Sequence, residues 1–190
     1  MPQHRSSRRG GTSEGAHRRE LHETVRSAVP DLPAASMGHD TARTRAAMPK
    51  LHVIDSGLAA RLLRLTADEL SQRNPTAFQP FGHLLETFVV GEALKQVSWM
   101  DGVAGVGHRR THDGAEVDLV IERNDGSVVA IEVKAGTRVS DRDLAGLRLI
   151  RDELGDAFVA GVVVYIGARS YNADDRLAVL PVDRLWTPTR

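Results

Sequence analysis

The stretch that decides the fold is GAEVDLVIERNDGSVVAIEVKAG, residues 114–136. Two runs of strand-forming residues, 117–122 and 128–134, flank the tripeptide Asn-Asp-Gly at 124–126. This tripeptide is typical of a three-residue hairpin loop that ends with glycine in the left-handed region. The stretch therefore predicts an antiparallel hairpin, and the length of its loop sets the register of the two strands.

The predicted register determines which side chains share a face of the hairpin. Counting back from the loop places Asp118 opposite Glu132 and Glu116 opposite Lys134. Since opposed residues share a face, one face is wholly apolar and consists of Val117, Leu119, Ile121, Val129, Ile131 and Val133. The other face mixes charged and apolar residues: Glu116, Asp118, Val120, Glu122, Val128, Ala130, Glu132 and Lys134.

Two opposed carboxylates in a half-apolar setting repel each other and call for a cation. A hard divalent ion such as Mg²⁺ binds carboxylate oxygens and would meet this need. An amphipathic hairpin with a solvated charged face is the alternative interpretation. A two-residue turn would place Asp118 and Glu132 on opposite faces, so the metal hypothesis depends on the loop.

Glu86 is the second unusual carboxylate. It lies in a predicted helix over residues 81–97, and its neighbours at helical spacing are apolar, which calls for a partner or a shifted pKa. A structural ion pair, for example with an arginine, is one interpretation. A carboxylate directed at the same metal is the other.

The remaining pattern predicts one α/β domain with a mixed sheet. Besides the hairpin and its preceding helix, it comprises strands at 103–108 and 158–166, a helix at 141–154 and a last edge strand at 176–181. The order is helix, three strands, helix and strand, and the crossover helix implies one parallel pairing. Upstream, we expect a short strand at 50–55, a short helix at 57–65, a loop at 66–80, and downstream a turn at 109–114.

Residues 1–48 lack hydrophobic periodicity, so we expect a disordered N-terminal extension. It is either a basic arm for nucleic acid or a dispensable extension. Residues 1–50 carry nine basic and five acidic side chains, whereas 51–190 carry 16 and 20, so the folded part has no general basic footprint. The chain has no cysteine and no apolar run long enough for a membrane helix, which favours a cytoplasmic protein without a membrane partner.

Helix-Glu86, strand-Asp118 and then Glu132-Val133-Lys134 resemble the motif of the PD-(D/E)XK nuclease superfamily, with Val117 where that motif usually has proline. The longer wording, including KLHVIDSGLAARLL (50–63), GHLLETFVVGEALKQ (82–96) and VVAIEVKAG (128–136), resembles the C-terminal domain of bacterial and archaeal AAA-type ATPases that is called domain of unknown function 4143. This resemblance implies a restriction-endonuclease-like core over residues 50–187.

The resemblance also implies roles for individual residues. Asp118, Glu132 and Glu86 would bind Mg²⁺ or Mn²⁺, aided by the Val133 carbonyl, and Lys134 would orient the attacking water. No lysine of the chain stands in a phosphate-binding G-x-x-x-x-G-K-[ST] motif, so no ATP site is expected, and the chain resembles a stand-alone copy of the domain.

We therefore expect a divalent-metal-dependent nuclease-like domain that acts on phosphodiesters of nucleic acid. The alternative is a non-catalytic DNA-binding or regulatory module, a remnant of an ATPase C-terminal domain, and an ATPase chain is a candidate partner. The candidate nucleic-acid contacts are Arg109, Arg110, Arg138 and Arg142. His108 and His112 are expected at the surface rather than at a zinc site.

Overall fold

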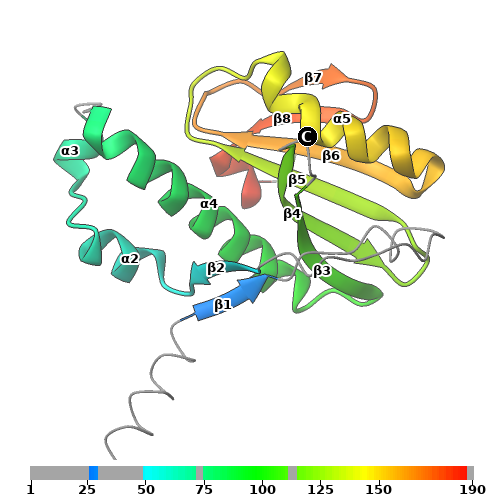
Figure 1. Ribbon diagram of the computed structural model, residues 1–190, viewed down its shortest axis with the longest axis horizontal. Coiled ribbons are helices and arrows are strands. Elements are labelled where there is room, and N and C mark those ends of the chain that lie inside the picture. The colour runs from blue at the N-terminus through cyan, green and yellow to red at the C-terminus, as the bar shows by residue number, and fades with distance from the viewer. Residues whose placement is uncertain (1–25, 30–48, 72–74, 111–114, 188–190) are drawn as a thin grey trace, which may run out of the picture.

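The computed structural model describes residues 26–29, 49–71, 75–110 and 115–187 (Figure 1). Its centre is a six-stranded mixed sheet. In spatial order the strands are β3 (Val103–Arg110), β4 (Glu116–Arg123), β5 (Val128–Lys134), β6 (Phe158–Tyr165), β8 (Leu177–Pro181) and β7 (Tyr171–Asp174). β5, β6 and β8 run parallel and the other pairs antiparallel, so the predicted α/β fold with a mixed sheet is confirmed.

The helices are α2 (Ser56–Leu62), α3 (Ala67–Ser71), α4 (Pro75–Val97) and α5 (Asp141–Leu154), with 3-10 turns η2 (Gly155–Ala157) and η3 (Val182–Leu185). Helices α4 and α5 cover opposite faces of this sheet, and α2 and α3 pack against α4. Leu119 packs against α4, whereas its neighbour Val120 lies in the cluster that α5 covers. This two-layer cover is consistent with a restriction-endonuclease-like core. Within the described ranges, no helix is long and apolar enough to cross a bilayer.

Several element bounds differ from the sequence predictions, and the predicted loop at 66–80 contains α3 and the start of α4. α4 begins at Pro75 instead of residue 81, because proline lacks only a donor that the first helical turn does not use. β8 is not an edge strand, since β7 covers it. No pattern in the sequence indicated β7, because its residues YNAD are mostly exposed and polar.

A second, two-stranded sheet lies beside the core (Figure 1). β1 (Arg26–Val29) pairs antiparallel with β2 (Lys50–Val53). The four residues of β1 lie within the segment 1–48 that was predicted to be disordered. The rest of that segment lies outside the described residues, and its disorder stays a prediction.

The register predicted for the hairpin is confirmed from Leu119 to Glu122, and the pairs predicted beyond it, Asp118 with Glu132 and Glu116 with Lys134, are not part of the observed ladder. Leu119 pairs with Ile131 and Glu122 with Val128, as the three-residue loop requires. Gly126 has φ +79°, in the left-handed region, and the Arg123 N–H donates to the Ser127 carbonyl at 2.9 Å.

A β-bulge in β4 changes the predicted faces near its start. Gly107 pairs with Val120 and Arg109 with Val117, so two residues of β4 oppose the single residue His108. The bulge reverses the alternation, and Val117 packs with Val120 in the α5 cluster instead of on the α4 face. The prediction that Glu116 and Asp118 share the face of Val120 is therefore wrong, since both flank Val117 and both contact Lys50. His108 is buried, which corrects the expectation of a surface residue, and His112 lies outside the described residues.

Candidate functional site

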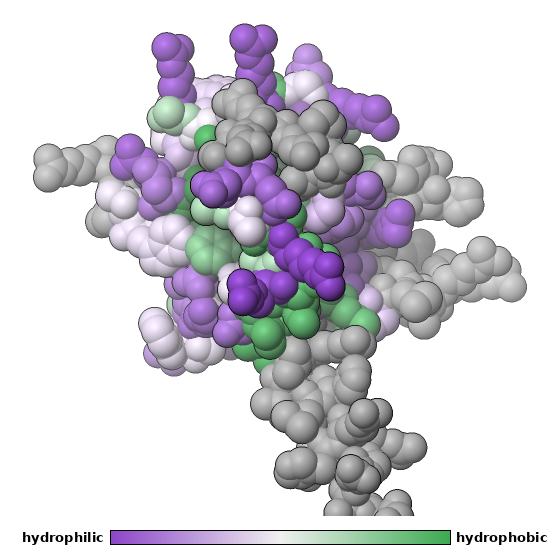
Figure 2. All heavy atoms as spheres, turned by 90° about the vertical axis from the view of Figure 1, so that its left-hand side faces the viewer, coloured by the Kyte–Doolittle hydropathy of each residue, from purple (hydrophilic) through white to green (hydrophobic). Residues whose placement is uncertain are grey.

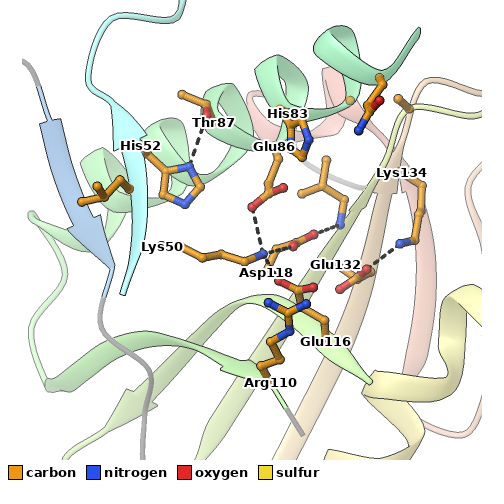
Figure 3. A pocket seen from close by; sticks show the side chains of 15 residues that line it. Lys50, His52, His83, Glu86, Thr87, Arg110, Glu116, Asp118, Glu132 and Lys134 are labelled. Carbon is orange, nitrogen blue, oxygen red and sulfur yellow. Dashed lines mark hydrogen bonds and ion pairs between the residues drawn. The ribbon is translucent and has the colours of Figure 1, made fainter. Parts of the chain in front are cut away.

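The site lies at the open end of the hairpin, away from its loop. Beyond the pair Leu119–Ile131, Asp118 Oδ2 accepts a hydrogen bond from the Val133 N–H at 2.8 Å. A cavity of about 740 Å³ opens here, and β2, α4, β4 and β5 contribute to its lining. Figure 3 shows charged side chains from these four elements pointing toward one another.

Lys50 supplies the cation at the centre of this cavity. Its Nζ lies 2.9 Å from Glu86 Oε1, 2.6 Å from Glu116 Oε1 and 2.7 Å from Asp118 Oδ1 (Figure 3). Burial disfavours the charged form, but the charge and hydrogen bond of Asp118 and the hydrogen bond of Glu116 outweigh it, so the pKa of Lys50 is raised. Lys50 therefore stays an ammonium that offsets three carboxylates.

Glu132 and Lys134 form the second pair of charges. Lys134 Nζ donates to Glu132 Oε1 at 2.6 Å and lies 3.9 Å from Asp143 at the start of α5. Glu132 is 6% exposed, and its Oε2 has no hydrogen-bond partner within the described part of the chain. Burial and the neighbouring charge of Asp118 raise the pKa of Glu132 to about 8. The pKa of Lys134 is raised as well, since the attraction of Glu132 outweighs burial.

Glu86 reaches the cavity from α4, as the metal hypothesis requires, but its contact is an ion pair. Its partner is Lys50 rather than an arginine. Burial and the charge of Asp118 raise the pKa of Glu86 in spite of this pair. The interpretation of Glu86 as a member of an ion pair is therefore observed, and its role at a metal stays a prediction.

A family profile described as "Domain of unknown function (DUF4143)" matches residues 81–185, more than half of the chain. The chain belongs to this family. The DUF4143 match contains Glu86, Asp118, Glu132 and Lys134, whereas Lys50 lies before it. β2 therefore completes the cavity from outside the matched range.

Other comparisons add little to this family. A crystal structure of protein VC1899 from Vibrio cholerae matches 90% of this chain with 18% identity and a TM-score of 0.42. The chain spans 46% of the length of that protein. No curated protein matches the chain.

The four candidate arginines of the DUF4143 domain separate into two groups. Arg110 lines the cavity, on the rim beside Glu116 (Figure 3). Arg109 is turned to the α5 side, where it pairs with Glu153. Arg138 and Arg142 are exposed and do not line the cavity. The fold brings only Arg110 to the site.

A divalent cation at this site would have to be held by few protein ligands. Mg²⁺ is usually bound through one or two carboxylates and keeps several waters. Asp118 and Glu132 are buried beside each other, and the orphaned Glu132 Oε2 has an unused binding position. Among the residues that the structure describes, no three or more His, Asp or Glu side chains form a ready-made metal cage.

Sequence reasoning missed the contribution of β2 to the site. Lys50 and His52 alternate along the strand, and both line the cavity. His52 is buried, its Nδ1 lies 3.2 Å from Thr87 Oγ1, and burial and the charge of Lys50 lower its pKa. One signal was available, because the chain has only three lysines against 22 arginines. Two of the three, Lys50 and Lys134, line one cavity.

Proposed function

We propose that this DUF4143 domain is a divalent-metal-dependent nuclease-like domain that hydrolyses phosphodiesters of nucleic acid. The observation that supports it most is that Asp118 and Glu132 line one cavity. Both carboxylates are buried, and one oxygen of Glu132 has no partner in the described ranges. A buried carboxylate with an unused oxygen is costly unless it gains a proton or a cation.

In this proposal Asp118 and Glu132 hold Mg²⁺ or Mn²⁺. The bound ion would polarise the phosphoryl oxygen and lower the pKa of the attacking water. The Val133 N–H fixes Asp118 Oδ2, which leaves Oδ1 for the cation. Glu86 would act on the cation directly or through water.

Lys134 would orient the water and offset charge on the phosphate. Its ammonium has three donors, and its bond to Glu132 uses one of them. The water oxygen forms a bond to phosphorus, the ester P–O bond breaks, and the proton of the water ends on the leaving oxygen. A compact ammonium suits this position better than the planar fork of arginine.

Nucleic acid would approach over the cavity rim, where Arg110 provides a cation for a flanking phosphate. The exposed Arg138 and Arg142 remain candidate contacts for phosphates farther from the cavity. An ATPase chain is the partner that the resemblance to ATPase C-terminal domains suggests. Binding of nucleic acid and binding of an ATPase chain are both part of this proposal.

A non-catalytic DNA-binding or regulatory module is the second candidate. The observation that favours it is Lys50, whose ammonium already offsets Glu86, Glu116 and Asp118. A site that is neutralised by its own chain can be stable without a metal. The two candidates differ in whether metal binding is followed by cleavage.

Cleavage of plasmid and single-stranded DNA with and without Mg²⁺ or Mn²⁺ tests the proposal, together with metal-dependent melting. At a metal concentration about 100 times Kd, wild type should gain about 2.7 kcal/mol of stability. Asp118→Asn and Glu132→Gln should lose both cleavage and this gain. Lys134→Met should lose cleavage and keep metal binding.

Lys95→Met is the matched control, because Lys95 is exposed and pairs only with Glu92 of the same helix among described residues. It should cleave as wild type does. Metal binding by the wild type without cleavage of any nucleic acid would favour the regulatory module. Absence of a metal-dependent shift in melting would reject both the metal site and the nuclease proposal.

A further inference from the structure

The position of Lys50 raises the question of how a metal could enter this site. Its ammonium lies 2.7 Å from Asp118 Oδ1, the oxygen that the proposed metal would need. The other oxygen, Oδ2, is already engaged by the Val133 N–H. A metal ion and the Lys50 ammonium therefore compete for the same carboxylate oxygen.

We propose that the Lys50 ammonium and a divalent metal ion are alternative counter-ions of Asp118. The site then binds metal when the Lys50 side chain, which β2 carries, moves away from Asp118. This inference rests on the proposed function and adds a competitor from the chain itself. In the metal-free state Lys50 holds Glu86, Glu116 and Asp118 together. In the metal-bound state the ion takes that role.

The charge of the cavity supports exchange rather than addition. Its lining includes four carboxylates, from Glu86, Glu116, Asp118 and Glu132, and three cationic side chains, from Lys50, Arg110 and Lys134. With all four carboxylates ionised, as binding of a metal through Glu132 requires, the described lining has an excess of one negative charge, and of two without Lys50. A divalent ion balances the second arrangement. Beside a retained Lys50 it would be repelled at a few ångströms in a partly buried setting.

A second observation singles out this acidic cluster as a cation site. Glu132 is more than nine-tenths buried, it lines the cavity, and its Oε2 has no partner in the described part of the chain. Within the described residues, the ion pairs of Lys50 are to the other three carboxylates, so it leaves this oxygen unsatisfied. The ammonium therefore satisfies only part of the cluster, and a metal between Asp118 and Glu132 would satisfy the rest.

The fold allows Lys50 to leave without disturbing the core. Lys50 is the first residue of β2, which pairs with β1 and lies outside the six-stranded sheet. The surface around β2 and α2 carries large exposed apolar side chains (Figure 2), namely Leu51, Ile54, Leu58, Leu62 and Leu63. His52 keeps its contact with Thr87 while the four-carbon stem of Lys50 swings out. Release then needs a change of side-chain rotamer only.

Amine labelling of the wild-type chain, followed by mass spectrometry of each lysine, tests the exchange directly. Three lysines make the assignment simple. In the presence of a metal chelator, Lys50 should react slowly with the amine label, because three ion pairs hold its ammonium. Saturating Mg²⁺ should raise its labelling rate about tenfold or more, the ratio expected when an ion pair of about 1.4 kcal/mol or more is lost. Lys95 serves as the internal control and should label equally with and without Mg²⁺.

Lys50→Met provides the second measurement. It removes the competing charge and keeps the stem, so Mn²⁺ and Mg²⁺ should bind about tenfold more tightly or better than to wild type. Lys95→Met should bind them as wild type does. The metal-free Lys50→Met variant should melt at a lower temperature, and metal should restore more stability to it than to wild type. If this variant does not fold, the labelling of wild type still decides.

Unchanged or slower labelling of Lys50 at a metal concentration that fully shifts melting would overturn the exchange, as would equal or weaker metal binding by Lys50→Met. In that case the metal shift and its loss in Asp118→Asn would leave the proposed function intact. Release of Lys50 without cleavage would reject the nuclease and keep the exchange. A chain whose melting does not respond to metal would reject both.

Discussion

The two ends of the β4–β5 hairpin carry the same kinds of residue in different surroundings. At the loop end, Arg123 and Asp125 have side chains 55% and 60% exposed, and Asp125 bonds Ser127, two residues away. At the open end, Asp118 and Glu132 are buried. Lys50, which bonds Asp118, is 68 residues away in sequence.

This difference separates exposed charges, which contribute little to stability, from buried charges, which destabilise the fold unless they have a partner. A carboxylate in water interacts weakly with its neighbours. A buried carboxylate needs a counter-ion, a donor or a proton. The open end uses all three devices, through Lys50, the Val133 N–H and the raised pKa of Glu132.

Asp118→Ala should have the largest effect on the free energy of unfolding. It leaves the buried Val133 N–H without its acceptor and removes one of three partners of Lys50. We expect a loss of about 3 kcal/mol, measured by urea unfolding. Asp118→Asn retains an acceptor and should lose less. Equal losses in the two variants would mean that charge alone matters at this end.

Gly146→Ala should destabilise the open end of the hairpin by disturbing the packing of α5 against it. A Cβ at Gly146 in α5 would lie 2.5 Å from the Glu116 carbonyl oxygen and 3.1 Å from Val117 Cγ2. The helix would have to move from the open end of the hairpin, at a cost of about 2 kcal/mol. Gly91→Ala in α4 is the matched control, since nothing lies within 4 Å of its Cβ. Thermal melting should show the control unchanged or stabilised.

The raised pKa of Glu132 predicts how the free energy of unfolding of the metal-free protein, kept so by a chelator, depends on pH. Between its ordinary value of 4.5 and about 8, the folded state holds a proton that the unfolded chain has lost. Stability should therefore fall as pH rises, by on the order of 1 kcal/mol per pH unit from pH 6.5 to 8. The lowered pKa of His52 acts in the opposite direction and below 6.5.

Glu132→Gln tests this origin, since glutamine cannot ionise. Urea unfolding of the variant at a series of pH values between 6.5 and 8 should show a flatter dependence than wild type. The same slope in both proteins would show that another group titrates in this range.

Asp125→Ala at the loop end should have the smallest effect. Its carboxylate is exposed, accepts hydrogen bonds from the neighbouring Ser127 and lies 3.7 Å from the Arg123 guanidinium, so its contacts in the described part of the chain are all local. The urea midpoint should stay close to that of wild type. A loss as large as that of Asp118→Ala would remove the distinction between the two ends.

The hairpin was predictable in register because its loop is local. Asn124-Asp125-Gly126 specifies a turn whose hydrogen bonds lie within four residues, and the pairing follows from it. α5 was predicted at its observed bounds for a similar reason, with Ser140 and Asp143 forming a local capping box. The bulge at Asp118 and Leu119 was not predictable, because it depends on pairing with β3.

The sequence by itself determined the α/β order of elements, the hairpin register and the convergence of Glu86, Asp118, Glu132 and Lys134 on one cavity. These follow from periodicity, turn chemistry and a family resemblance that span neighbouring elements. Only the tertiary structure decided which cation the carboxylates meet. Lys50 reaches them across the space between β2 and β4, and no local pattern encodes a contact between residues 68 positions apart.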